Sequence, residues 1–147
     1  MISKEKFLSL QGKWALKRST NGFGNMQGVA VFSPFVGQYP SLLYREEGTF
    51  FTPQEGLFDF YRDYIYFLND KQIDVYFVSV SKKQDLFLSL TPSSTNRSAT
   101  GSHMCKEDLY VATYQFLDSD TFTLYYEIKG PKKDLIIETL FERVHLS

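Results

Sequence analysis

Cysteine is almost absent from this chain, and neither sign of charge is in excess. Cys105 is the single cysteine among 147 residues, which excludes an internal disulfide and any zinc site built on two or more thiolates. Lysine and arginine together number 16, against 17 aspartates and glutamates. A surface for nucleic acid or for an anionic membrane is therefore not expected.

Long apolar runs are missing as well. No stretch approaches the ~20 apolar residues that a helix needs to cross a bilayer. The opening MISKEKFLSL mixes charged with apolar side chains and lacks the continuous apolar segment of a signal peptide. We therefore expect a cytoplasmic protein.

Aromatic residues are abundant instead, with 14 Phe, 10 Tyr and one Trp making 17% of the chain. The hydrophobic share of 43% excludes intrinsic disorder as the overall state. Because flat rings pack well on a pleated surface, this composition favours β-sheet. The length suits a single domain that spans residues 1–147.

The hydrophobic periodicity predicts one short helix followed by strands. Residues 3–10 form the expected helix, because Ser3 is a good N-cap, an apolar stripe follows it, and Gly12 ends it. From there the pattern alternates with period two, and turn-forming residues lie near most breaks. The predicted strands are residues 13–19, 26–33, 41–51, 57–68, 72–80, 84–91, 107–117, 120–128 and 134–144.

Successive strands with short connections form an antiparallel meander, which closes on itself most economically because closure removes the sheet edges. The expected fold is all-β, a single up-and-down barrel of about eight to ten strands with a short N-terminal helix. An immunoglobulin-like sandwich is the alternative, weakened by the single cysteine and by the early position of Trp14. Residues 92–102 are small and polar, and we expect a flexible loop there.

The segment Gly12-x-Trp14, on the first strand after a short helix, resembles the opening motif of lipocalins and other calycin barrels. In those proteins a late arginine covers the tryptophan, and Arg143 on the last strand is the matching position. The resemblance therefore implies that Trp14 and Arg143 pack together. A guanidinium on an indole ring contributes about 0.5–2 kcal/mol, so we expect a structural clamp at one end of the barrel.

More of the chain resembles a smaller lipocalin-like family that is known only as a domain of unknown function. Its most specific block is His-x-Cys-x-x-Asp-x-Tyr, and one departure is Leu88 after Phe87, where that family tends to have histidine. The resemblance implies a fold rather than an activity. It is carried by Gly12-x-Trp14, Arg18, Gly28-x-Ala30-x-Phe32, Tyr44-x-Glu46-x-Gly48, Arg62-x-Tyr64, Val75-x-Phe77, His103-x-Cys105-x-x-Asp108-x-Tyr110, Gly130-Pro131-x-Lys133 and Arg143.

Strand alternation places four charged residues on the same face as Trp14. Arg18, Arg62, Glu46 and Asp108 would then share the interior of the barrel with several tyrosines. Buried charges are costly unless they are paired and hydrogen-bonded. The charges either satisfy one another across the barrel or line a polar pocket that binds a ligand.

For the pocket, we expect a small and partly aromatic organic molecule of about 300 Å³. Arg18 and Arg62 would bind its acidic or carbonyl-bearing end, because a planar guanidinium fork suits a carboxylate. Glu46 and Asp108 would orient the arginines. The remaining candidate ligand-binding residues are Tyr44, Tyr64 and Tyr110 around the apolar body, His103 as a hydrogen-bond partner, Cys105, and Lys133 at the barrel mouth.

Two other functions stay open. A small barrel enzyme would use His103, Asp108, Glu46 and Tyr110 as acid–base groups, and haem or a metal could bind through His103. His103 and Cys105 lie about 6.6 Å apart along a regular strand, and Asp108 has the opposite parity unless a bulge intervenes. A catalytic or metal cluster there would need an irregular backbone. The sequence assigns no cofactor and no oligomeric state, and an interaction module with a solid interior is a third possibility.

Overall fold

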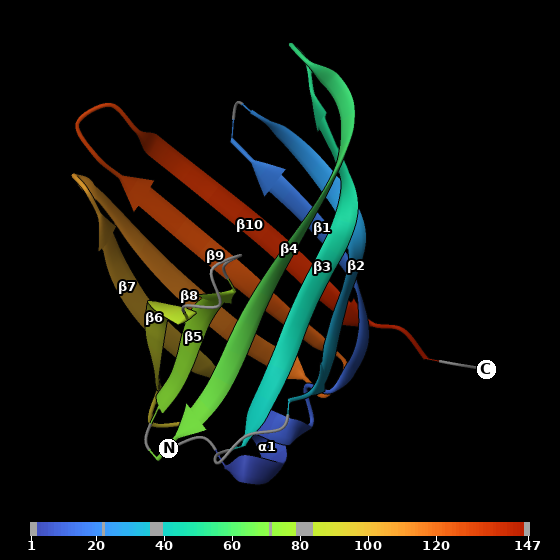
Figure 1. Cartoon of the computed structure of the whole chain (residues 1–147), viewed down its shortest axis with the longest axis vertical. Coiled ribbons are helices and arrows are strands. Elements are labelled where there is room, and N and C mark those ends of the chain that lie inside the picture. The colour runs from blue at the N-terminus through green and yellow to red at the C-terminus, as the bar shows by residue number, and fades with distance from the viewer. Residues whose placement is uncertain (1–2, 22, 36–39, 71, 79–83, 146–147) are drawn as a thin grey trace.

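The computed structural model describes residues 3–21, 23–35, 40–70, 72–78 and 84–145. One short helix precedes a series of strands in these residues (Figure 1). The elements are α1 (Lys4–Leu8), β1 (Gly12–Thr20), β2 (Gly24–Pro34), β3 (Ser41–Thr52), β4 (Gly56–Asn69), β5 (Gln72–Val78), β6 (Gln84–Pro92), β7 (Ser98–Cys105), β8 (Asp108–Asp118), β9 (Thr121–Lys129) and β10 (Asp134–Arg143).

The strands form a closed barrel in which each strand pairs antiparallel with its neighbours in sequence. The barrel closes where β1 pairs with β10, with Trp14 opposite Arg143 and Thr20 opposite Ile137. The predicted all-β, up-and-down barrel with a short N-terminal helix is therefore confirmed. Nine predicted strands recur within about two residues at each described end; residues 79–80 of one of them lie outside the described residues.

Strand β7 is the element that the sequence did not predict. The expected loop at 92–102 is too long: Pro92 ends β6 and residues 98–102 belong to β7, so only residues 93–97 connect the strands. Ala99 and Gly101 alternate as the buried residues of this strand. A Cβ atom at Gly101 would lie 2.5 Å from the Ser89 carbonyl oxygen. The small residues thus allow close packing of β7 on β6 rather than chain flexibility.

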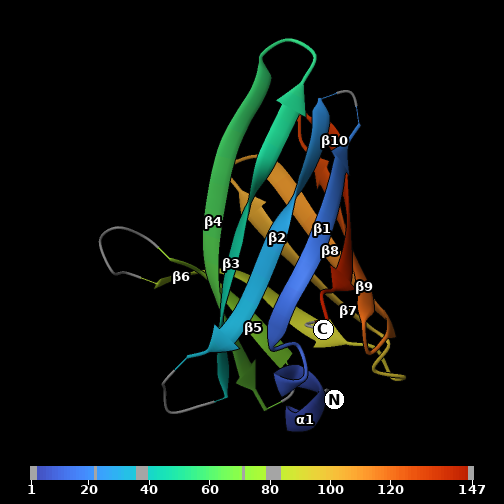
Figure 2. The same cartoon turned by 90° about the vertical axis from the view of Figure 1, so that its right-hand side faces the viewer.

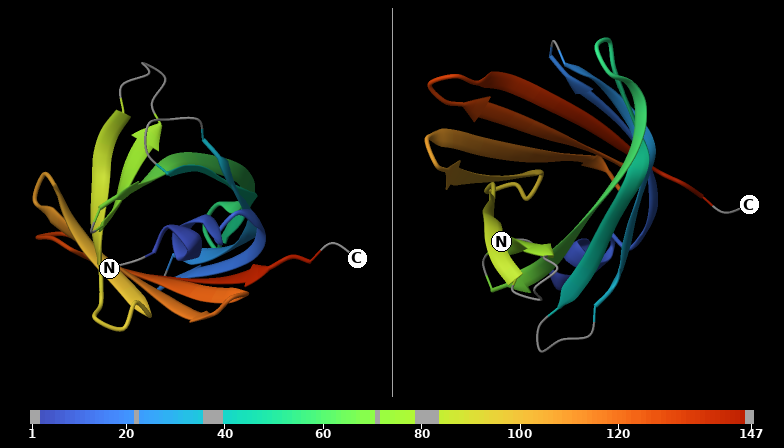
Figure 3. Two further views of the ribbon diagram at one scale, coloured as in Figure 1. Left: turned by 90° about the horizontal axis from the view of Figure 1, so that it is seen from below. Right: turned by 45° about the horizontal axis from the view of Figure 1, so that its top comes forward.

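Helix α1 closes one end of the barrel. Its N-cap Ser3 accepts a hydrogen bond from the Lys6 backbone N–H, 3.0 Å away, and the side chain of Phe7 is completely buried. Seen from below, the helix lies within the ring of strands (Figure 3). Within the described residues, no helix is long and apolar enough to span a membrane.

Arg143 fixes this closed end to the rest of the barrel. Its guanidinium carbon lies 4.2 Å from the ring centroid of Trp14. The same side chain pairs with the Asp120 carboxylate at 3.1 Å and donates to the carbonyl oxygens of Ser9 and Gln11 at 2.7 and 2.8 Å. The expected Trp14–Arg143 clamp is therefore present, and it also ties the segment after α1 to β10.

Gly12 is required beside this clamp for two reasons. Its φ of +125° is a conformation that residues with side chains rarely adopt. A Cβ atom there would also lie 3.1 Å from Nη1 of Arg143. The glycine of the Gly-x-Trp motif thus leaves room for the guanidinium that covers the tryptophan.

Replacing Arg143 by alanine should lower the free energy of unfolding by about 2 kcal/mol or more. The change removes a cation–π contact and several charged hydrogen bonds at once. Urea denaturation, followed by the fluorescence of the single tryptophan, measures this loss. Arg45→Ala is the matched control, since Arg45 lies 4.4 Å from the Tyr61 ring on the exposed surface and should contribute little. Equal stability of wild type and Arg143→Ala would contradict the clamp.

Candidate functional site

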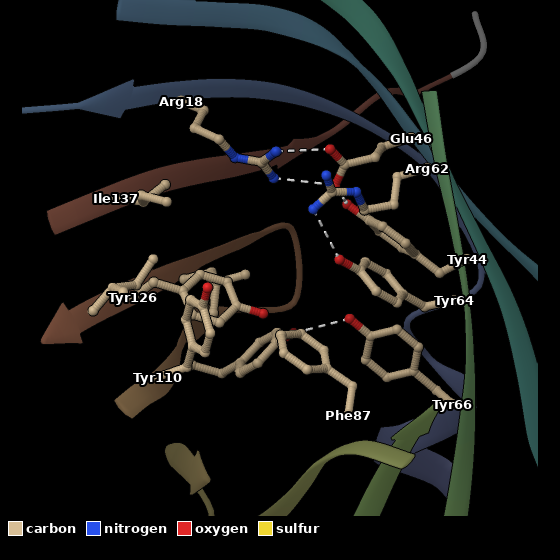
Figure 4. A pocket seen from close by; sticks show the side chains of 13 residues that line it. Arg18, Tyr44, Glu46, Arg62, Tyr64, Tyr66, Phe87, Tyr110, Tyr126 and Ile137 are labelled. Atoms are coloured by element: carbon tan, nitrogen blue, oxygen red, sulfur yellow. Dashed lines mark hydrogen bonds and ion pairs between the residues drawn. The ribbon is translucent and has the colours of Figure 1, made fainter. Parts of the chain in front are cut away.

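The interior charges cluster in the middle of the barrel, where three strands direct them inward. Arg18 comes from β1, Glu46 from β3 and Arg62 from β4 (Figure 4). Glu46 and Arg62 are directly opposite each other in the β3–β4 ladder. The predicted faces of all three are confirmed, because each contributes to the lining of one internal pocket.

Arg18 and Glu46 form a bidentate ion pair. Nη1 of Arg18 lies 2.7 Å from Oε2 of Glu46, and Nη2 lies 3.1 Å from Oε1. The Tyr44 hydroxyl donates to Oε1 at 2.7 Å, and Nε of Arg18 donates to Oγ1 of Thr139 at 2.8 Å. The side chains of Arg18 and Glu46 are only 16% and 3% exposed. The charges of Arg18 and Glu46 are therefore paired and hydrogen-bonded, as expected if the interior charges satisfy one another.

The ionisation of these groups follows from burial opposed by pairing. Burial by itself would raise the pKa of Glu46, but hydrogen bonds and charge from Arg18, with the Tyr44 hydroxyl, outweigh it and hold that pKa below its ordinary value. Burial would likewise lower the pKa of Arg18, but pairing with Glu46 raises it. The pair therefore stays ionised at neutral pH, and its two charges cancel.

Arg62 differs from Arg18 because its charge is unmatched. Its Nη1 donates to the Tyr64 hydroxyl at 3.3 Å. Among the described residues, no carboxylate lies within 4.0 Å of its guanidinium, whereas Glu46 is already held by Arg18. Two cations and one anion thus leave one net positive charge at this site. Arg62 is also exposed, so the pocket reaches solvent at its guanidinium.

Tyrosine hydroxyls surround the same space. Those of Tyr66 and Tyr114 bond to each other at 2.9 Å. Within the described residues, the hydroxyls of Tyr110 and Tyr126 make no hydrogen bond, although both residues line the pocket. Burial is the largest cause that raises tyrosine pKa values here, so these phenols stay protonated and can donate. The pKa values raised in this way belong to Tyr44, Tyr64, Tyr66, Tyr114 and Tyr126.

The void between these groups has a volume of about 120 Å³. The expected volume of about 300 Å³ is therefore wrong, because aromatic rings fill much of the barrel; Tyr44 and Tyr66, for example, pack with centroids 5.7 Å apart. A dry protein cavity of about 150 Å³ holds one benzene molecule. The lining residues are Arg18, Tyr44, Glu46, Arg62, Tyr64, Tyr66, Phe87, Tyr110, Tyr114, Leu124, Tyr126, Ile128 and Ile137.

The other predicted site residues lie elsewhere. Cys105 pairs with Asp108 across a tight β7–β8 hairpin in which Lys106 has a φ of +57°, so the motif contains a turn rather than the suggested bulge. Cys105 is exposed. The Asp108 carboxylate lies 3.5 Å from Nζ of Lys133, so Asp108 does not orient the arginines. None of these three side chains lines the pocket.

His103 lies beside the pocket rather than in its wall. Its ring is 5.6 Å from that of Phe87 and 6.4 Å from that of Tyr110, and both of those residues line the void. Glu46 is held by Arg18, and Asp108 is held by Lys133. The four acid–base candidates are thus not assembled into one cluster. The described residues contain no group of three His, Cys, Asp or Glu side chains placed to bind a metal.

Sequence reasoning missed Tyr126, which lines the pocket, and Thr139, which does not line it but holds Arg18. Thr139 is buried and accepts a hydrogen bond from Arg18, and Tyr126 contributes to the pocket wall. Extending the alternation to β9 would have found Tyr126, which shares the inward face with Phe122 and Leu124. The same procedure on β10 places Thr139 with Ile137 and Phe141.

A family model described as a family of unknown function, DUF6314, matches residues 10–143. The chain belongs to this family. No curated protein sequence matches it. The DUF6314 chain does resemble solved barrels, at identities so low that they show the fold alone.

This chain is similar to the structure of the S-type phycobiliprotein lyase CPES from Guillardia theta. The TM-score is 0.72 and the sequence identity 11%, and the match covers 100% of this chain and 95% of that one. A structure of EF1p2_mFAP2b bound to DFHBI is similar with a TM-score of 0.54 and 12% sequence identity, and the match covers 96% of this chain and 98% of that one. A redesigned β-barrel, mFAP1, bound to DFHBI is similar with a TM-score of 0.52 and 12% sequence identity, and the match covers 96% of this chain and 100% of that one. These similarities support the closed antiparallel β-barrel as the fold of this chain.

Replacing Glu46 by glutamine should lower the free energy of unfolding by about 3–5 kcal/mol at neutral pH, because Arg18 would stay buried without a counter-charge. Chemical denaturation measures this loss, and Glu138→Gln, on the exposed face of β10, should leave stability nearly unchanged.

The difference between wild type and Glu46→Gln should also depend on pH. The folded pKa of Glu46 lies below its ordinary value of 4.5, so the ion pair contributes its stability above that pH and loses it as the pH falls through the folded value. The two denaturation midpoints should therefore converge in acid. A difference that stays constant with pH would contradict the ionised pair.

Proposed function

We propose that this barrel binds a small organic acid and holds its carboxylate inside the barrel at Arg62. The observation that carries the proposal is the unmatched guanidinium at the edge of an internal void. Arg18 and Glu46 neutralise each other, so a ligand with one negative charge would complete the charge balance of the site.

The groups around the void suit a carboxylate attached to an aromatic ring. A guanidinium keeps its charge when it is desolvated and offers a planar fork of donors. Protonated hydroxyls of Tyr64 and Tyr126 add neutral donors. The rings of Tyr64 and Phe87, which pack with centroids 5.8 Å apart, line the void and offer apolar contact to a flat ligand. The volume of about 120 Å³ is smaller than the cavity of about 150 Å³ that holds one benzene molecule, so the void admits the carboxylate and only part of the ring.

In this proposal the segments that resemble the family have two different roles. Tyr44-x-Glu46 and Arg62-x-Tyr64 form the binding site, whereas Gly12-x-Trp14 and Arg143 close the other end of the barrel. Arg18 then acts as a positioning residue that holds Glu46. The designed barrels bound to DFHBI support the proposal in one respect, since a barrel of similar architecture holds a small molecule.

Benzoate is the smallest probe that tests the proposal, and isothermal titration calorimetry measures its binding. Wild-type protein should bind benzoate weakly, in the millimolar range or tighter. Arg62→Met should weaken binding about tenfold or more, because a charged hydrogen bond of about 1.5–3 kcal/mol is lost.

Arg97→Met is the control, since it removes the same charge from an exposed arginine near Trp14 at the closed end of the barrel. This variant should bind benzoate like wild type. Equal loss in both variants would mean that net charge alone attracts the anion, and it would refute the site. Absence of benzoate binding to the wild type would refute it as well.

A further inference from the structure

The inward face of β4 changes character beyond Arg62. Tyr66, Tyr64 and Arg62 follow one another along the pocket wall, and Phe60 and Phe58 continue the same face toward the tip of the β3–β4 hairpin. Phe50 of β3 lies directly opposite Phe58. Its ring is 5.2 Å from that of Phe58 and 6.4 Å from that of Phe60. We call Phe50, Phe58 and Phe60 the aromatic wall.

The aromatic wall is open to solvent at Phe58, whereas Phe50 and Phe60 are half-buried. Phe58 is 42% exposed, although its side chain is on the inward face. The described β4–β5 pairing covers only Tyr64–Asn69, so among the described residues 56–63 of β4 are paired with β3 alone. Figure 2 shows the β3–β4 hairpin extending beyond the neighbouring strand ends. An apolar surface of this kind, next to a polar pocket, is typical of a binding site.

The order of groups along β4 gives a direction to the ligand. Along this face the hydroxyls of Tyr66 and Tyr64 come first, Arg62 follows with Glu46 directly opposite it, and the apolar rings come last. Phe60 is about 6.6 Å from Arg62 along the strand. A ligand that inserts its charged end first would leave its apolar body beside these rings.

We propose that the ligand is an elongated organic acid whose carboxylate enters the void at Arg62 and whose apolar body lies outside the void, on the aromatic wall. This inference rests on the proposed carboxylate site at Arg62. We choose this occupant because the aromatic wall continues the face of β4 that carries Arg62 in the pocket. The outer face of the same hairpin does not lead to the charged groups inside the barrel. That outer face carries Phe51 and Leu57, which are 46% and 71% exposed.

The experiment compares benzoate with biphenyl-4-carboxylate, which adds one phenyl ring at the far end from the carboxylate. Biphenyl-4-carboxylate should bind wild-type protein about tenfold or more tightly than benzoate, because the second ring buries apolar surface against Phe58. Phe58→Ser should remove most of this gain while leaving benzoate affinity unchanged. Phe58→Leu, which keeps an apolar side chain, should retain part of it.

Phe51→Ser is the matched control. Phe51 is in the same hairpin and is similarly exposed, but its side chain is on the outer face, so this variant should bind both acids like wild type. Thermal melting confirms that each variant is folded, and the inward residue Phe60→Leu provides a second test of the wall.

The outcomes separate this inference from the proposed function. If benzoate binds in an Arg62-dependent way but biphenyl-4-carboxylate binds no more tightly, the aromatic wall is refuted and the carboxylate site stands. If neither acid binds, both are refuted. Equal effects of Phe51→Ser and Phe58→Ser would also overturn the inference. So would sedimentation showing that Phe58→Ser only converts a dimer into a monomer, because the wall would then contact a second copy of the chain.

Discussion

Two arginines and one glutamate share the interior face of this barrel, and the cost of burying charge determines how they are arranged. An ion taken out of water is tolerated only when it is paired and hydrogen-bonded. Glu46 can neutralise one guanidinium, and it pairs with the more buried one, Arg18, with help from Tyr44 and Thr139. Arg62 therefore remains without a counter-charge, at the place where the void meets solvent. The capacity of the site to hold an anion follows from this imbalance.

The two ends of the barrel support this arrangement in different ways. At the closed end, the buried rings of Trp14, Phe122 and Phe141 pack together, and Arg143 lies over Trp14. Among the described residues, β6 and β7 share only two pairs, Thr91 with Thr100 and Pro92 with Ala99. Both lie next to the connection between these strands at the closed end, so the described parts of the strands are not paired toward the other end. The polar centre is accessible from solvent at Arg62, which is exposed and lines the void. The packing that stabilises the barrel and the access to its polar centre are thus at opposite ends of the barrel.

Alternation along single strands predicted much of this site, because side-chain direction in a strand is a local property. It assigned Arg18, Glu46 and Arg62 to the interior correctly. Which arginine meets Glu46 was not predictable, since β1 and β3 are not neighbours in the sheet and their side chains meet only across the curved interior. Asp108 shows the same limit: it lies at the end of β8, where a hairpin brings it to Lys133 instead. The volume of the void was not predictable from the sequence either, because it depends on how many aromatic rings pack together inside the barrel.

The central claim is that an acid enters the barrel with its carboxylate at Arg62 and its apolar body toward the hairpin tip. A crystal structure of the protein with biphenyl-4-carboxylate tests this most directly. The account predicts a carboxylate oxygen within hydrogen-bond distance of the Arg62 guanidinium, about 2.7–2.9 Å, with the outer ring against Phe58. A ligand bound outside the barrel, or one with its rings deep inside and its carboxylate in solvent, would contradict it.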